Sequence, residues 1–269
     1  MSDQQVLVTE LTTNNGYVLG SLTLNTEASL NSLTLDMIRN LNAALQRWQQ
    51  RDDVVAVVLS GRGDKAFCAG GDIQALYRSC IANQQAGAEV DDYARRFFTE
   101  EYQLDLVLHE YPKPVLTLGH GVVMGGGFGL LSASRFRVLT ERSRLAFPEI
   151  TIGLFPDAGG SWVLKNLALP VAAFLGLTGS QLNARDALQL GIGTHVVDHE
   201  SRHELVEKLL TLPWAMRAEQ DNAELIEQLL SSVHTEPSDL ENELAALPDW
   251  QVTVDDLLAT ADALSALAG

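Results

Sequence analysis

Basic residues are scarce in this chain of 269 residues. Lysine and arginine number 18 against 35 aspartate and glutamate residues, so the formal net charge is −17. Residues 201–269 hold 14 of the acidic residues and only 3 of the basic ones. Binding to nucleic acid needs a basic face that neutralises phosphates, so we expect no nucleic-acid partner. An anionic small ligand stays compatible with this charge, because backbone N–H groups bind anions without positive side chains.

Cysteines are few, and neither a long apolar run nor a leader pattern is found. The two cysteines, Cys68 and Cys80, cannot build a disulfide framework. No apolar run approaches the roughly 20 residues of a membrane span, and the first ten residues lack the basic start and apolar stretch of a signal peptide. We therefore expect a cytoplasmic protein without a membrane partner. His109, His120 and His195 are scattered without metal-ligand spacing, so we expect no metal.

An alternation of strands and helices fills the chain up to about residue 198. Strand patterns occupy 5–10, 17–24, 54–61, 114–121 and 135–140, and helical patterns begin at Thr34 and Asp72 and cover 89–110. This order predicts βαβ units and an α/β core over residues 1–200. An acidic helical segment, 201–269, should follow, with helices over 201–212, 217–233, 238–246 and 253–268.

Two glycine-rich stretches share one form, a strand followed by glycines and a helix. The first is GRGDKAFCAGGDIQALY, residues 61–77, and the second is PVLTLGHGVVMGGGFGLL, residues 114–131. Such turns direct free backbone N–H groups at whatever lies above them. Two of them could aim two N–H groups at one oxygen, which would form an oxyanion hole for acyl chemistry. The alternative is that the glycines only allow close packing of helix on strand. Neither stretch has the spacing of a dinucleotide or phosphate loop.

Three motifs, AFCAGGDI, GHGVVMGGGFGL and FPEITIGLFPDAGG, occur in the order and at the spacing of the crotonase (enoyl-CoA hydratase/isomerase) superfamily. Residues 5–198 resemble that superfamily. The resemblance implies an α/β fold built as a spiral of ββα units, here followed by the C-terminal helical segment. It also implies a homo-oligomer, a trimer or a hexamer made of two trimers.

In that superfamily the two glycine loops form the oxyanion hole for the carbonyl of a CoA thioester. By position, the donors would be the N–H groups of Gly71 and Gly126. The first loop borders the CoA moiety, so the resemblance implies Ala69, Gly70, Gly71 and Asp72 as CoA neighbours. Coenzyme A would enter as part of an acyl-CoA substrate, and no separate cofactor is expected.

The resemblance also favours one kind of chemistry. Hydratases of the superfamily use two glutamates, and in this chain the first position is Gly129 while the second is Glu149. The set Glu101, Gly126, Glu149 and Asp157 is similar to the 3-hydroxyisobutyryl-CoA hydrolase branch, a thioesterase of valine degradation, in which the matching residues contact the substrate. The resemblance implies hydrolysis of a short β-hydroxyacyl-CoA. Glu149 would activate water or attack directly, and Asp157 would orient the substrate or the water.

Other interpretations stay open for these residues. Glu149, after Pro148, could be a turn cap; Asp157 could cap the next helix; and Glu101 could lie on a solvated helix face. Cys68 is expected to be a small buried residue without a nucleophilic role. Another activity of the superfamily, hydration or isomerisation, and a noncatalytic CoA-binding relative are the alternative functions.

Overall fold

Two β-sheets organise the chain in the computed structural model, which describes residues 4–216, 218–238 and 240. The strands of the larger sheet are β1 (Val6–Thr12), β2 (Val18–Leu24), β3 (Val54–Gly61), β5 (Val115–Gly119), β7 (Phe136–Thr140) and β10 (His195–Val197). They pair in the order β1-β2-β3-β5-β7-β10, and only β1 and β2 are antiparallel. The strands of the smaller sheet are β4 (Ala66–Cys68), β6 (Val122–Met124), β8 (Arg144–Ala146) and β9 (Leu182–Asn183), paired in that order.

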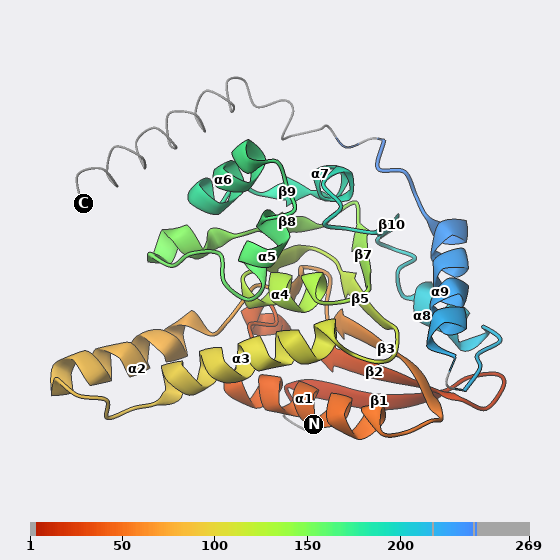
Figure 1. Ribbon diagram of the computed structural model, residues 1–269, viewed down its shortest axis with the longest axis horizontal. Helices are drawn as coiled ribbons and strands as arrows, with labels where there is room; N and C mark the ends of the chain where they lie inside the picture. Colours follow the sequence, from red (N-terminus) through yellow and green to blue (C-terminus); the bar gives the residue numbers. More distant parts are fainter. Residues whose placement is uncertain (1–3, 217, 239, 241–269) are drawn as a thin grey trace.

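Helices surround the two sheets (Figure 1). The α-helices of the described residues are α1 (Leu35–Gln49), α2 (Ile73–Ala86), α3 (Tyr93–His109), α4 (Gly126–Ser132), α5 (Gly160–Leu164), α6 (Leu169–Thr178), α7 (Ala184–Gln189), α8 (Glu204–Leu210) and α9 (Glu219–Val233). Two short 3₁₀ helices are η1 (Glu27–Ser29) and η2 (Pro148–Ile152). Within this part of the chain, no helix is both long enough and apolar enough to cross a bilayer.

A repeated ββα unit confirms the predicted α/β spiral. In the pairs β3 with β4, β5 with β6, and β7 with β8, the first strand joins the larger sheet and the second joins the smaller one. Helices follow each pair: α2 and α3, then α4, then η2 and α5. The strands β4 and β6 were not predicted, because each has three residues and lies inside a glycine-rich stretch, too short to show an alternating pattern.

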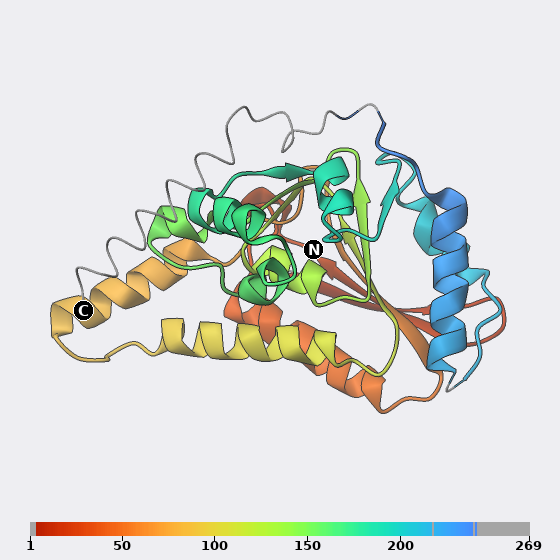
Figure 2. The same ribbon diagram turned by 45° about the horizontal axis from the view of Figure 1, so that its top comes forward.

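One face of the larger sheet carries the main hydrophobic core. Helix α1 begins as predicted at Thr34, whose hydroxyl accepts a hydrogen bond from the Met37 N–H at 3.2 Å. Its apolar stripe, which includes Ile38, Leu45 and Trp48, is buried in this core. Figures 1 and 2 show α1 and α3 side by side along this face. Helix α3 therefore rests on a fixed base, with its other side turned toward the glycine loops.

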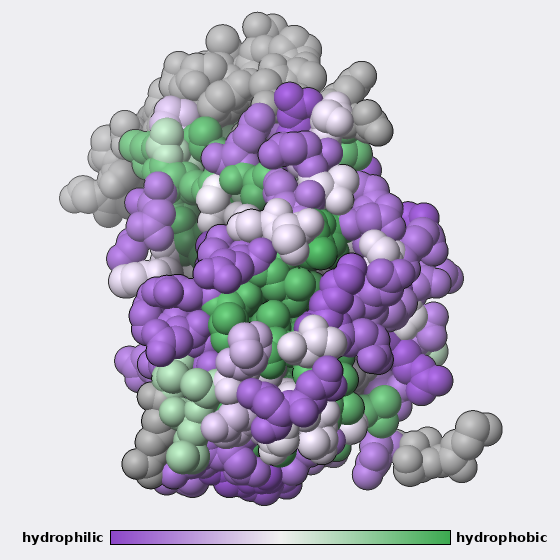
Figure 3. All heavy atoms as spheres, turned by 90° about the vertical axis from the view of Figure 1, so that its right-hand side faces the viewer, coloured by the Kyte–Doolittle hydropathy of each residue, from purple (hydrophilic) through white to green (hydrophobic). Residues whose placement is uncertain are grey.

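The opposite face of the larger sheet is covered by α8 and α9, which confirms the predicted helices over 201–212 and 217–233. Leu205 and Ile226 from these helices pack with Val55 and Leu116 of the sheet in a second hydrophobic cluster. Figure 3 shows this side of the molecule as mostly hydrophilic, with hydrophobic side chains gathered in a central strip. Helix 253–268 and most of helix 238–246 lie outside the described residues. The domain boundary at residue 200 stays a prediction.

Candidate active site

The pairing of β4 with β6 brings the two glycine loops together. These strands run parallel, so the loops that follow them emerge at the same edge of the smaller sheet. Gly70 and Gly125 have φ angles of +104° and +50°, in the region that glycine occupies without strain. A Cβ on Gly125 would lie 3.5 Å from the Gly70 Cα and 3.7 Å from Glu149 Oε1. The loops therefore touch through their backbones, with the Glu149 carboxyl group beside them.

The N–H groups of Gly71 and Gly126 have no hydrogen-bond acceptor within the described residues. Gly126 is the first residue of α4, where the N–H has no partner in the helix and the helix dipole favours negative charge. The close-packing interpretation of the glycines holds at Gly127, where a Cβ would clash with the backbone of Cys68. The glycine-rich stretch thus contains both packing positions and a free donor.

A cavity of about 430 Å³ lies over these loops. Its lining includes nearly all the predicted site residues: Ala69, Gly70, Gly71, Glu101, Gly126, Glu149 and Asp157. Asp72 is not among its lining residues. The Asp72 side chain caps α2 by accepting a hydrogen bond from the Ala75 N–H at 3.0 Å. The structure thus gathers the predicted residues from separate elements around one hollow, with Asp72 at its border.

Glu149 is buried in η2, with 5% of its surface exposed. Its Oε2 has no hydrogen-bond partner within the described residues. The N-cap of η2 is Phe147 and its C-cap is Gly153, so Glu149 is not the cap residue of this turn. Burial raises the pKa of Glu149 to about 7, with a further contribution from the nearby charge of Asp157. A carboxyl group with this pKa can both accept and release a proton near neutral pH.

Asp157 is held by Tyr102, whose hydroxyl donates a hydrogen bond to Asp157 Oδ2 at 2.7 Å. Burial raises the pKa of Asp157, while this hydrogen bond opposes the rise. The next helix, α5, has Gly159 at its N-cap and no side-chain cap, so Asp157 does not cap it. Asp157 is among the residues that line the cavity.

Glu101 lies on the inner face of α3 with 3% of its surface exposed, so the solvated-face interpretation is wrong. A Cβ on Gly126 would clash with Glu101 Oε1, which places this carboxyl group directly against the start of α4. Its neighbour Glu100 is on the outer face and pairs with Arg39 at 2.6 Å. Burial, followed by the charges of Asp105, Asp157 and Glu149, raises the pKa of Glu101 well above its ordinary value.

Asp105 is a buried acidic residue that the sequence analysis missed. It lies four residues after Glu101, on the same face of α3, and is 8% exposed. A Cβ on Gly129 would lie 2.8 Å from Asp105 Oδ2 and 2.7 Å from the Ala158 carbonyl oxygen. The i, i+4 spacing of the two acids was the available signal. Position 129 therefore has no room for a side chain in this arrangement, because Asp105 and Ala158 occupy the space that it would need.

Two further residues near the glycine loops, His120 and Cys68, are buried. His120 is buried, and one ring nitrogen, Nε2, lies 2.8 Å from the Gly63 carbonyl oxygen. Burial lowers the pKa of His120 to about 4, so the ring is neutral at pH 7. Cys68 is buried, as predicted, and burial raises its pKa to about 12, which disfavours the nucleophilic thiolate.

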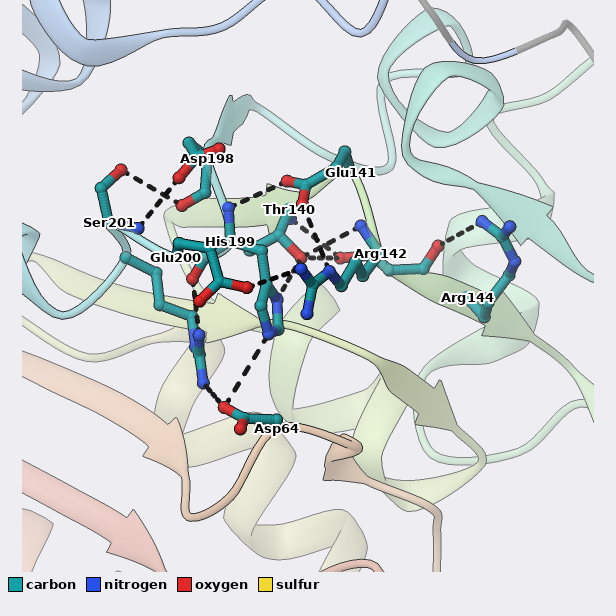
Figure 4. Close-up of polar contacts among 11 residues, drawn as sticks. Asp64, Thr140, Glu141, Arg142, Arg144, Asp198, His199, Glu200 and Ser201 are labelled. Atoms are coloured by element: carbon teal, nitrogen blue, oxygen red, sulfur yellow. Dashed lines mark hydrogen bonds and ion pairs between the residues drawn. The ribbon is translucent and has the colours of Figure 1, made fainter.

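Arg202 ties the first glycine loop to the C-terminal helical segment. It is 4% exposed, and its guanidinium donates hydrogen bonds to the carbonyl oxygens of His199 at 2.5 Å and Gly63 at 3.3 Å, and to the Asp64 carboxylate. Figure 4 shows Asp64 facing His199, whose Nε2 lies 3.9 Å from Asp64 Oδ1. These contacts brace the loop that leads to Gly71.

Replacing Arg202 by alanine is expected to lower the free energy of unfolding by about 1–3 kcal/mol, because the buried carbonyl of His199 loses its charged donor. Urea unfolding would measure the difference. The matched control is Arg142→Ala, which removes an exposed pair with Glu200, also visible in Figure 4, and should cost less than about 1 kcal/mol. Equal losses in the two variants would contradict the bracing role.

The sequence matches the Enoyl-CoA hydratase/isomerase family over residues 19–267. It is also similar to curated proteins named "3-hydroxyisobutyryl-CoA hydrolase, mitochondrial". That of Rattus norvegicus is 42% identical over 215 residues, which are 80% of this chain and 52% of the relative. That of Homo sapiens is 42% identical over 217 residues, which are 81% of this chain and 53% of the relative. The chain spans about half the length of these curated relatives.

Two solved structures share the fold. A carnitinyl-CoA dehydratase from Mycobacterium thermoresistibile aligns with a TM-score of 0.76 and 32% identity, covering 93% of this chain and 66% of that one. An enoyl-CoA hydratase from Rhodobacter sphaeroides 2.4.1 aligns with a TM-score of 0.68 and 29% identity, covering 88% of this chain and 72% of that one. These similarities confirm the crotonase-like α/β fold that the three motifs implied.

Proposed function

Because the chain belongs to the enoyl-CoA hydratase/isomerase family, we propose that it is a CoA-thioester hydrolase of the 3-hydroxyisobutyryl-CoA hydrolase type, acting on a short β-hydroxyacyl-CoA. One observation carries this proposal: two unpaired N–H groups, of Gly71 and Gly126, line the same cavity as the buried carboxyl group of Glu149. Such an arrangement suits attack on a carbonyl whose oxygen becomes negative. The names of the curated relatives support the same reaction.

In the proposed reaction the thioester oxygen accepts hydrogen bonds from Gly71 and Gly126. Glu149 takes a proton from a water molecule as the water oxygen bonds to the carbonyl carbon. The C–S bond then breaks, the acid and the CoA thiolate form, and the proton passes to solvent or to the thiolate. Direct attack by Glu149, which gives a mixed anhydride that water hydrolyses, is the other route to the same products.

The charges around the cavity fit a hydroxyl group on the acyl chain. Tyr102 occupies one oxygen of Asp157, which leaves the other as an acceptor for a substrate hydroxyl or for water. Glu101 contacts the first residue of α4, where an ionised carboxylate would oppose negative charge on the thioester oxygen. Its raised pKa favours the uncharged form, which removes that repulsion. The first glycine loop, Ala69 to Gly71 with Asp72 beside it, would border CoA.

The rate of thioester hydrolysis is expected to depend on pH through Glu149. Its carboxylate is the base, so kcat/KM should fall as pH drops below about 7 and reach a plateau above it. In Asp157→Asn the midpoint should move to lower pH, because the variant lacks a neighbouring negative charge that raises the pKa of Glu149. A pH–rate profile of both proteins measures this, and an unchanged midpoint in the variant would contradict the coupling.

Free thiol release from a panel of acyl-CoAs tests the proposed function. The panel includes 3-hydroxyisobutyryl-CoA, 3-hydroxypropionyl-CoA and acetyl-CoA, and hydration of crotonyl-CoA is measured alongside. We expect thiol release from the hydroxyacyl substrates to exceed that from acetyl-CoA. Hydration without thiol release would overturn the proposal.

Hydration of an enoyl-CoA is the second candidate reaction. Asp105 favours it, because its carboxyl group lies beside Gly129, the position from which hydratases of the family supply one of their acids. The structural relative from Rhodobacter sphaeroides is named a hydratase. We rank this reaction second because Asp105 is not among the lining residues of the cavity that holds Glu149.

We further propose that the chain assembles as a trimer or as a pair of trimers and works in the cytoplasm. The proposal of a trimer or a pair of trimers follows from the family. The curated relatives are named as mitochondrial, which is a property of those proteins.

A further inference from the structure

Asp105 is buried without a polar partner. Both of its carboxyl oxygens are inaccessible and have no hydrogen-bond partner within the described residues. An ionised carboxylate in such a place would be strongly disfavoured, because nothing replaces the water it loses. Burial, together with the charge of Asp157, accordingly raises the pKa of Asp105 well above its ordinary value. Burial thus favours the uncharged form of this side chain.

The surroundings of Asp105 connect it to the turn that carries Asp157. Asp105 Oδ2 and the Ala158 carbonyl oxygen converge on the bare backbone of Gly129. Ala158 has a φ angle of +42°, an uncommon conformation for a residue with a side chain, and it is 3% exposed. Such a conformation persists only where the surrounding packing fixes it. The backbone of Gly129 is part of that packing, and Asp105 Oδ2 lies against the same backbone.

A second cavity adjoins the same group of residues. It measures about 420 Å³, and Tyr102, Asp105, Gly129 and Ala158 are among its lining residues. Tyr102 is the residue whose hydroxyl binds Asp157 in the proposed active site. Ala158 thus borders this second cavity, while Asp157 next to it lines the active-site cavity. A turn beside two cavities needs support from its remaining neighbours to hold Asp157 in place.

We propose that Asp105 is a positioning residue of the active site, which supports the Ala158 turn against Gly129 and thereby fixes the Asp157 carboxyl group toward the acyl end of the substrate. This inference rests on the proposed function. Asp105 touches no reacting atom; it acts through Asp157. The same role explains why position 129 is glycine, because any side chain there would displace Asp105 or the Ala158 carbonyl group.

Three variants test the role. Asp105→Ala should lower kcat by about 10- to 100-fold with KM changed less than threefold, because a small displacement of a reacting group has effects of this order. Asp105→Asn keeps the size and the uncharged state and should keep kcat within about threefold of the wild type. Gln103→Ala, at an exposed position of the same helix, is the matched control and should leave both constants unchanged.

Leu104→Ala separates positioning from general loss of stability. Leu104 is buried on α3 next to Asp105, so this variant should unfold at a lower temperature while its folded fraction keeps the wild-type kcat. If Leu104→Ala matched the kcat loss of Asp105→Ala, or if Asp105→Ala stayed within twofold of the wild type, the positioning role would be overturned. An Asp105→Asn variant as impaired as Asp105→Ala would also overturn it.

Infrared spectroscopy provides a readout that does not need the hydrolase reaction. At pH 7 the C=O stretch of protonated carboxyl groups should lose intensity in Asp105→Asn. It should stay unchanged in Glu100→Gln, because the hydrogen bond from Arg39 lowers the pKa of Glu100 and keeps that carboxyl group ionised in the wild type. An unchanged band in Asp105→Asn would overturn the uncharged state. A wild-type protein that hydrates crotonyl-CoA without releasing thiol would contradict the proposed hydrolase function but not the positioning role of Asp105. The kcat values of the variants would then be compared for hydration.

Discussion

Replacing Glu149 by glutamine is expected to lower kcat for thiol release by about 100- to 10,000-fold, the range that a general base contributes. Glutamine keeps the size and polarity of the side chain but cannot accept the proton of water. The residue is buried against the glycine loops, and its Oε2 has no competing partner within the described residues, so this oxygen is free to accept the proton. KM should change less than threefold, because the acyl-CoA contacts survive.

The matched control for this variant is Glu100→Gln. This variant also removes one carboxylate, but Glu100 lies on the outer face of α3 and pairs with Arg39. The kcat and KM of Glu100→Gln should equal those of the wild type. Thermal unfolding of all three proteins shows whether Glu149→Gln is folded, and a raised melting temperature would fit the removal of a buried acid. A folded Glu149→Gln enzyme with more than a tenth of the wild-type kcat would remove Glu149 from the mechanism.

Replacing Gly126 by alanine is expected to lower kcat by about 100- to 1000-fold, the effect of losing one oxyanion donor. The added Cβ would clash with Glu101 Oε1 and would lie 3.1 Å from Leu33 Cδ1. Either α4 moves, which turns the Gly126 N–H away from the thioester oxygen, or Glu101 moves into the cavity. Both outcomes damage the transition state more than the binding of CoA.

Gly176→Ala in α6 is the control for Gly126→Ala. Its added Cβ would meet its nearest neighbour at 3.3 Å, and alanine is the better helix former, so kcat should not change. Steady-state thiol release measures both variants, with circular dichroism as a check on folding. An active Gly126→Ala enzyme would show that its N–H is not needed, and the oxyanion hole would have to be sought elsewhere.

Local sequence patterns predicted most of the elements. The apolar stripe from Leu35 to Trp48, with Thr34 before it, is enough to place α1 and its cap, because helical periodicity and capping act within a few residues. The run at 54–61 predicts a strand buried on both faces, and β3 contributes to both hydrophobic clusters. The strands β4 and β6 escaped notice because three residues carry no period.

The sequence by itself determined the family motifs, the two glycine loops and the absence of an acid at position 129. Only the tertiary structure decided which carboxyl groups meet. Glu101 and Asp105 come from α3, Glu149 from η2 and Asp157 from the turn before α5, and the contacts among them depend on how the sheets and helices pack. Burial then sets their protonation, and burial is a property of the whole fold. For that reason the sequence showed only that position 129 lacks an acidic side chain. The structure shows that Asp105 Oδ2 lies where a side chain at position 129 would be.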